Sequence, residues 1–158
     1  PMPWTAEGGF SEANPWHGYP DNKSSNNVAA MDDDPDSLLN RYRTLINLRN
    51  KHRPLQVGKL VPLETSTSRI YSFLRYTPEE TMLVLINLSS ERSEYDISLP
   101  AGPWKEGANV EPVYLNGEEV RVTSQPEANE YGGFWDYKPI DSLSEAGTYI
   151  FRVSGAEE

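Results

Sequence analysis

The stretch that decides the fold spans residues 34–54 and reads DPDSLLNRYRTLINLRNKHRP. Its apolar residues recur at the i, i+3, i+4 and i+7 spacing of one helix face; they are Leu38, Leu39, Tyr42, Leu45 and Ile46. Asp34 is a good N-terminal capping residue, Pro35 suits the first helical position, and Pro54 ends the pattern. The sequence therefore predicts one amphipathic helix over residues 35–53.

The segment before this helix, residues 1–33, is rich in Pro, Gly, Asn, Ser and Asp and has no helical or alternating period. It predicts an irregular loop longer than compact domains usually contain, and such loops are commonly functional or disordered. Its aromatic residues are too numerous for an unstructured linker; they are Trp4, Phe10, Trp16 and Tyr19. We therefore expect an ordered loop whose aromatic rings pack against other parts of a protein.

After about residue 60 the apolar period changes to two, which is typical of strands. The strand candidates are residues 69–76, 82–88, 95–99, 111–115, 119–123 and 148–153. Residues 82–88 are almost continuously apolar, as in a central strand that is buried on both faces. Asn116 and Gly117 form a strong hairpin signal between residues 111–115 and 119–123. The fold class is therefore mainly β, with an antiparallel β-sandwich after the loop and the helix.

Bulk composition excludes several functions. The chain has 158 residues, 37% of them hydrophobic, and a formal net charge of −10. Nucleic acids and anionic membranes require a basic footprint, so neither is an expected partner. The sequence holds no apolar run of the length that spans a bilayer, and it has no cysteine. A neutral, hydroxyl-rich ligand such as a glucan is compatible with this charge but is not implied by it.

A linear pattern over the first sixty residues points to a known family. Its parts are Pro1-Met2-Pro3-Trp4, Gly9-Phe10-Ser11, Pro15-Trp16, Asn27-Val28 and residues 34–49. The pattern resembles the alpha-amylase family of glycoside hydrolases, where it joins the last strand of a (β/α)8 barrel to the last helix. A Greek-key β-sandwich called domain C follows in that family. The resemblance implies that residues 1–58 are the last loop and helix of the catalytic barrel and that residues 59–158 are the C-terminal sandwich.

The same resemblance implies a function for a longer parent protein. Retaining glycosidases need two carboxyl groups on either side of the scissile bond, and no acidic residue here lies in a catalytic motif of the family. We therefore assign no catalytic residue and expect a structural role within an enzyme that cleaves alpha-glucosidic bonds in starch-like glucans or malto-oligosaccharides. Two alternatives stay open: a non-enzymatic member of the fold, such as the ancillary heavy chain of amino-acid transporters, and a free-standing glycan-binding sandwich.

Aromatic residues supply the candidate binding sites. In the resembled family the loop before the last helix borders the substrate cleft, so Trp4, Phe10 and Trp16 are predicted to bind the alpha-glucan. Packing inside the protein is the competing interpretation, and we favour it for each ring taken alone. A separate glycan surface on the sandwich is a weaker hypothesis than packing for Trp104, Trp135 and Tyr137; its best candidate is the stretch 131–137.

Metal ligands are scarce. Asp32, Asp33 and Asp34 lack the alternating spacing of a calcium loop, so they are interpreted as solvated charges at a helix start. His17 and His52 are the only histidines, and without cysteine they do not make a zinc site. We expect no metal or cofactor in this chain, whereas the resemblance allows calcium in the parent. The expected partner is the remainder of the catalytic barrel.

Overall fold

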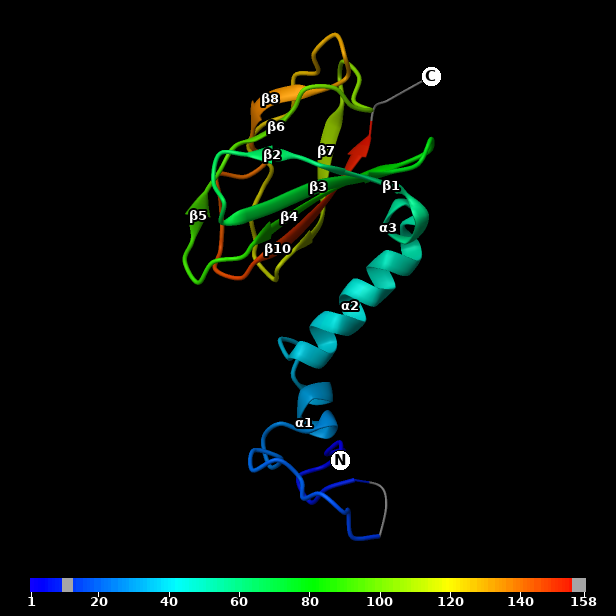
Figure 1. The fold of residues 1–158 in the computed structure, drawn as a ribbon, viewed down its shortest axis with the longest axis vertical. Helices are drawn as coiled ribbons and strands as arrows, with labels where there is room; N and C mark the ends of the chain where they lie inside the picture. The colour runs from blue at the N-terminus through cyan, green and yellow to red at the C-terminus, as the bar shows by residue number, and fades with distance from the viewer. Residues whose placement is uncertain (10–12, 155–158) are drawn as a thin grey trace. The chain divides into compact units, whose positions relative to one another are not determined.

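A computed structural model describes residues 1–9 and 13–154 of the chain. By contact density the chain divides into two units, Pro1–Lys51 and the part from His52 onward. The first unit holds helices α1 (Val28–Asp33) and α2 (Leu38–Lys51), and the second holds the short helix α3 (Arg53–Val57) and all the strands (Figure 1). The boundary between residues 58 and 59 that the resemblance implies stays a prediction. No helix among the described residues has the length and apolar character needed to cross a bilayer.

Residues 1–33 do not form one irregular loop, because the helix α1 lies at their end. Asn27 caps it: the side-chain oxygen accepts a hydrogen bond from Ala30 N at 2.9 Å, and the side-chain amide donates to Lys23 O at 2.9 Å. The sequence analysis missed this helix because six residues are too few to display a period. Asparagine at the cap was the available signal.

The predicted helix 35–53 is shorter than expected and begins later. Asp34 does not cap it; its carboxylate accepts from Asp36 N at 2.9 Å and thereby stabilises a turn. Ser37 is the cap, since its hydroxyl accepts from Asn40 N at 3.2 Å and α2 begins at the next residue. The helix ends at Lys51, and Pro54 lies in the first turn of α3 instead of terminating α2.

Antiparallel pairing joins every neighbouring pair of strands that the structure describes, so the prediction of a mainly β fold is confirmed. The larger sheet has the order β1-β3-β4-β10-β7; its strands are Lys59–Pro62, Ile70–Tyr76, Thr81–Asn87, Thr148–Ser154 and Asn109–Leu115. A smaller sheet has the order β2-β6-β8 (Glu64–Thr65, Ile97–Leu99 and Phe134–Tyr137), and β5 (Ser93–Glu94) pairs with β9 (Ser142–Leu143). Figure 1 shows β2, β6 and β8 grouped apart from β3, β4 and β10.

The core lies between these sheets. Its members come from both of them and include Leu74, Leu83, Leu85, Ile97, Phe134, Tyr149 and Phe151. The strand β4 occupies the middle position of the larger sheet, as its apolar run predicts, and four consecutive residues from Met82 to Leu85 are buried. Because successive strand residues face opposite ways, β4 is buried on both faces.

The predicted hairpin is half right. Asn116 and Gly117 adopt φ values of 55° and 80° and make a tight turn, in which Glu118 N donates to Leu115 O at 2.9 Å. Residues 119–123 nevertheless form no strand, and β7 pairs with β10 instead. Val120 and Val122 still pack against the core. The alternation of apolar and polar residues over 119–123 therefore reflects burial of an irregular segment and not hydrogen-bonded pairing with a neighbouring strand.

Candidate functional site

The N-terminal loop is held together by its own backbone. Gly8 O accepts hydrogen bonds from Trp4 N at 2.8 Å and from Thr5 N at 2.9 Å. The carbonyls of Pro3 and Trp4 accept from Val28 N at 3.1 Å and Ala29 N at 3.0 Å. Helix N-termini leave such N–H groups unsatisfied, so the loop start and α1 satisfy each other. These contacts give the residues around Trp4 a defined position.

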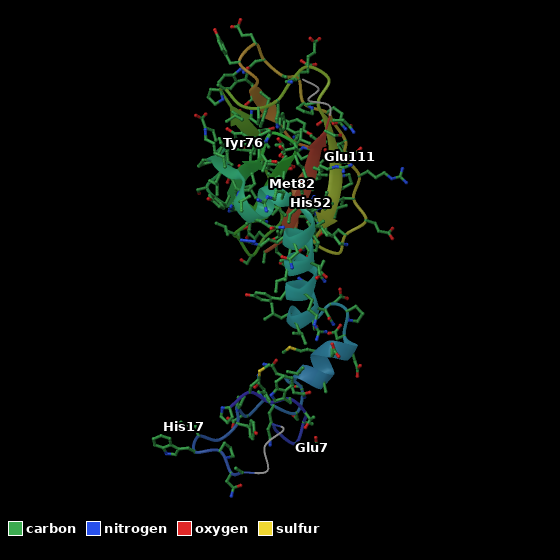
Figure 2. All side chains as sticks on the ribbon, turned by 90° about the vertical axis from the view of Figure 1, so that its right-hand side faces the viewer. Glu7, His17, His52, Tyr76, Met82 and Glu111 are labelled. Atoms are coloured by element: carbon green, nitrogen blue, oxygen red, sulfur yellow. The ribbon has the colours of Figure 1, made fainter. Side chains whose placement is uncertain are left out.

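The predicted substrate-binding residues differ in their surroundings. Trp4 is 42% exposed, and Trp16 is 96% exposed. The indole of Trp16 stacks on the imidazole of His17, with ring centroids 5.5 Å apart and planes inclined by 20°. Figure 2 shows His17 at the outer edge of this loop. Phe10 lies outside the described residues. A role in substrate binding stays a prediction for all three residues.

Several carboxylates in the described part of the chain are engaged in ion pairs. Asp32, on α1, pairs with Arg43 on α2. The Nδ1 of His52 lies 2.7 Å from Oε1 of Glu80. Neither pair has the two-carboxylate arrangement of a retaining glycosidase.

Residues 1–9 and 13–154 contain no group of three or more His, Cys, Asp or Glu side chains that could hold a metal ion. The aspartates at 32 and 33 end the short helix α1, and Asp34 stabilises the turn before α2. The three aspartates therefore lie at the end of one helix and in the turn before the next, not at the helix start that the sequence predicted.

The aromatic residues of the sandwich divide into a core group and a surface group. Trp104 is buried; it stacks on Phe134 at 4.1 Å between centroids and meets the edge of Tyr137 at 5.8 Å. The packing interpretation is therefore confirmed for Trp104 and Tyr137. Trp135 is 58% exposed and so does not pack in the core of this chain, and Tyr131, four residues earlier, is 67% exposed. The stretch 131–137 thus presents aromatic surface to solvent.

Apolar side chains also line one face of α2. Leu38, Tyr42 and Ile46, spaced by four residues, are each more than half exposed. The described residues leave Leu38 and Ile46 open, whereas Leu45 is partly buried. Residues four apart lie on the same helix face, so these side chains form one stripe, hereafter the α2 stripe.

The outer face of the larger sheet is apolar as well. The sequence of its strands contains this information, but the sequence analysis did not use it. In the register of β3, β4 and β10, Phe73 lies opposite Val84, and Val84 lies opposite Ile150. Tyr71 lies opposite Ile86 in the same way. None of these residues belongs to the core cluster between the sheets. The short helix α3 contacts β3 and β4.

Comparison with known proteins identifies the first part of the chain. Residues 1–58 match the family described as the catalytic domain of alpha amylase. This match assigns residues 1–58 to the alpha-amylase family. Relatives include an alpha-glucosidase of Candida albicans, 33% identical over 100 residues, which cover 61% of this chain and 18% of the relative. An alignment of that length exceeds residues 1–58, so the similarity to the alpha-amylase family extends into the sandwich.

Further relatives agree. The trehalose-6-phosphate hydrolase of Escherichia coli K12 is 30% identical over 124 residues, 73% of this chain and 22% of the relative. The solved trehalose-6-phosphate hydrolase of Bacillus licheniformis shares the fold with a TM-score of 0.72 at 22% identity, over 98% of this chain and 25% of that one. The chain thus spans about a fifth to a quarter of the length of these alpha-amylase-family proteins.

Proposed function

We propose that this chain is the C-terminal part of a longer alpha-amylase-type glycoside hydrolase that cleaves alpha-glucosidic bonds in starch-like glucans or malto-oligosaccharides. The names of the relatives support this proposal, since they include an alpha-glucosidase and a probable oligo-1,6-glucosidase of Bacillus subtilis. The chain's own role is structural. It completes the catalytic barrel, supplies one wall of the substrate cleft and fixes the sandwich to the barrel.

The observation that carries the proposal is the α2 stripe. Exposed contiguous apolar surface marks an interaction site, and an isolated helix with one apolar face gains most of its stability from packing. On the outer face of β3, β4 and β10, Tyr71 is exposed and Phe73 is partly exposed, whereas Val84 and Ile150 are already buried within the chain. We propose that the remainder of the barrel covers the α2 stripe and Tyr71 in the longer protein.

The chain supplies no catalytic carboxylate in this proposal, because its described ion pairs engage acidic residues structurally. The nucleophile and the acid–base residue belong to other parts of the longer enzyme. No cofactor is assigned to the chain, and a calcium ion of the longer enzyme would be held by residues outside it.

The proposed wall of the cleft contains Trp4, Phe10 and Trp16. The exposed indole of Trp16, stacked on His17, presents a flat apolar surface that suits the C–H face of a glucose ring. A residue that contributes equally to ground-state and transition-state binding changes KM and leaves kcat unaltered. In the longer enzyme, Trp16→Ala should therefore raise KM for malto-oligosaccharides with little change in kcat.

The test of the structural role compares two lysine substitutions on α2. Ile46→Lys places a charge in the α2 stripe, and Asn47→Lys places the same charge on the neighbouring exposed position. In the longer protein, Ile46→Lys should abolish soluble, active enzyme, whereas Asn47→Lys should leave hydrolysis of maltose, isomaltose and soluble starch intact. In the 158-residue chain alone, both variants should unfold like the unsubstituted chain.

Two results would overturn the proposal. Equal activity of the two lysine variants in the longer protein would show that the α2 stripe is not covered by the barrel. Turnover of any of these glucans by the 158-residue chain alone would show that the chain is itself catalytic. A longer protein that folds but hydrolyses none of them would favour the non-enzymatic alternative.

A further inference from the structure

A bulge in the smaller sheet turns two neighbouring side chains to the same face. Leu99 pairs with Phe134 and Ile97 pairs with Tyr137, so Ser98 alone lies opposite both Trp135 and Asp136. Phe134 and Tyr137 are buried in the core, whereas both residues between them are exposed. Asp136 has a φ of 46°, in the left-handed region that residues other than glycine enter rarely. Bulges of this kind re-aim side chains and are frequent beside functional sites.

Polar side chains surround the exposed indole of Trp135. Ser98 Oγ accepts a hydrogen bond from Asp136 N at 3.0 Å and lies 3.5 Å from the Asp136 carboxylate. Glu64 on β2 pairs with Ser98 across the sheet and is exposed. Cross-strand partners share a face of the sheet. A row of carboxylate, hydroxyl and carboxylate therefore runs beside the ring on the outer face of β2, β6 and β8.

The loop that leads into β8 is rigidly held. Asn129 Oδ1 accepts from Tyr131 N and from Gly133 N, each at 2.9 Å, and Asn129 Nδ2 donates to Pro100 O at 3.1 Å. Gly132 has a φ of 71°, and a Cβ there would collide with the backbone of residues 102 and 104. The exposed ring of Tyr131 thus stands on a fixed backbone, and preorganised sites bind with less loss of conformational freedom.

The chemistry of this face selects its ligand. An indole ring offers an apolar plane to the C–H face of a pyranose, and carboxylates accept hydrogen bonds from sugar hydroxyls. The two carboxylates and the net charge of −10 disfavour anionic ligands. An apolar protein partner would have to bury Glu64 and Asp136 without a counter-charge, which is costly. A neutral glycan meets all of these conditions.

The location also separates this face from the surfaces assigned to the barrel. The smaller sheet lies on the other side of the core from the outer face of β3 and β4, which α3 contacts. We propose that the outer face of β2, β6 and β8, centred on Trp135 and hereafter the Trp135 face, binds alpha-glucan chains without cleaving them. The choice of an alpha-glucan among glycans rests on the proposed function of the longer protein.

The experiment is affinity electrophoresis of the intact 158-residue chain in native gels that contain soluble starch, glycogen or dextran. The unsubstituted chain should be retarded by starch and glycogen. Trp135→Ala and Trp135→Gln should migrate as they do in gels without polysaccharide, and Asp136→Asn should be retarded less than the unsubstituted chain. Tyr71→Ala, which removes an exposed aromatic side chain from the outer face of the larger sheet, should keep full retardation. Unchanged thermal unfolding of each variant establishes that the fold is intact.

Each other outcome overturns the inference. These outcomes are an unsubstituted chain that no polysaccharide retards, retardation that survives both changes at Trp135, and retardation that is lost in Tyr71→Ala. Retardation by dextran alone would reject starch-type glucans as the ligand. Hydrolysis of glucans by the longer protein is measured separately. If the longer protein is active but retardation does not depend on Trp135, only this inference is rejected. If retardation depends on Trp135 but the longer protein hydrolyses no glucan, the proposed function is rejected and the binding site remains.

Discussion

Single residues that the sequence analysis passed over hold the sandwich together, and Asn87 at the end of β4 is the clearest of them. Its side chain is buried, and its amide nitrogen lies 2.7 Å from Glu91 O, 2.8 Å from Ser144 O and 3.2 Å from Leu143 O. Its side-chain oxygen accepts from Ser89 N at 3.0 Å. One side chain thus ties the end of β4 to the turn that follows it and to one distant segment at residues 143–144. Asparagine after an apolar run usually indicates only a turn, so nothing in the sequence distinguishes this role.

Replacing Asn87 should strongly destabilise the sandwich. Asn87→Ala leaves buried carbonyl oxygens without a donor, and each such group costs about 1–3 kcal/mol, so we expect a loss of about 3 kcal/mol in the free energy of unfolding. Asn87→Asp keeps the shape, removes the donor and should cost at least as much. Urea denaturation of the chain measures both. Asn109→Ala, at an exposed asparagine, is the control and should change stability by less than about 0.5 kcal/mol.

Tyr137 predicts an alkaline limit to stability. Burial raises the pKa of its phenol above the ordinary value, and the hydroxyl donates to Ser124 O at 3.1 Å. The folded state keeps this proton where the unfolded chain has released it, so stability is complete below a pH of about 10 and falls as the pH rises above it. Tyr137→Phe should lose about 1 kcal/mol at pH 8 with the hydrogen bond.

The pH dependence provides the decisive measurement for Tyr137. Between pH 8 and pH 11 the Tyr137→Phe variant should lose less stability than the unsubstituted chain, because it has one titrating group fewer. Urea midpoints taken across that range measure the difference. Parallel curves for the two proteins would show that Tyr137 does not titrate with unfolding.

At the scale of elements, the sequence predicted the types of element better than their ends. Asp34 and Ser37 are both residue types that cap helices, and Pro35 is common both in the first turn of a helix and in a β-turn. Local residue preferences therefore do not decide where α2 begins. The hydrogen bond from the Ser37 hydroxyl to Met31 O favours Ser37 as the start of α2. Met31 belongs to α1, a helix too short to show a period in the sequence. The outer face of the larger sheet was likewise missed, because it follows from strand register. The sequence named residues 131–137 as a candidate surface, but the bulge that exposes Trp135 and Asp136 together follows only from the pairing of β6 with β8.

The start of α2 can be tested directly. Ser37→Ala removes the acceptor for Asn40 N and the hydrogen bond to Met31 O, whereas Asp34→Ala removes only the acceptor for Asp36 N. A lost cap costs about 1 kcal/mol. We expect Ser37→Ala to accelerate amide hydrogen exchange in the first turn of α2 about fivefold and Asp34→Ala to have a smaller effect there. A larger effect from Asp34→Ala would restore Asp34 as the cap.

At the scale of the whole molecule, the two units differ in what they bury. The core cluster between the sheets draws its members from residue 63 onward. In the unit Pro1–Lys51, the buried residues that the structure describes include two polar residues, Asn27 and Ser37, in addition to the apolar Leu48. The resemblance to the alpha-amylase family explains this division, because a loop and a helix with an exposed apolar stripe are expected of a segment that belongs to a larger domain.

The difference in burial predicts unequal protection. In the isolated chain, native-state hydrogen exchange and limited proteolysis should find residues 60–154 protected and residues 1–58 open, since local stability follows buried apolar contact. Joining the chain to the rest of the barrel should extend protection to residues 1–58. Equal protection of both parts in the isolated chain would show that the N-terminal part is self-sufficient.

The placement of β10 beside β4 has a consequence for the order of events at the ribosome. The strand β4 ends at Asn87, and its second neighbour β10 begins only at Thr148. At a synthesis rate of about 5–20 residues per second, β4 waits roughly 3–12 s for that partner while its apolar side chains have only β3 beside them. The apolar side chains of β4 therefore stay exposed along that edge during this interval, and pairing with β10 ends the exposure.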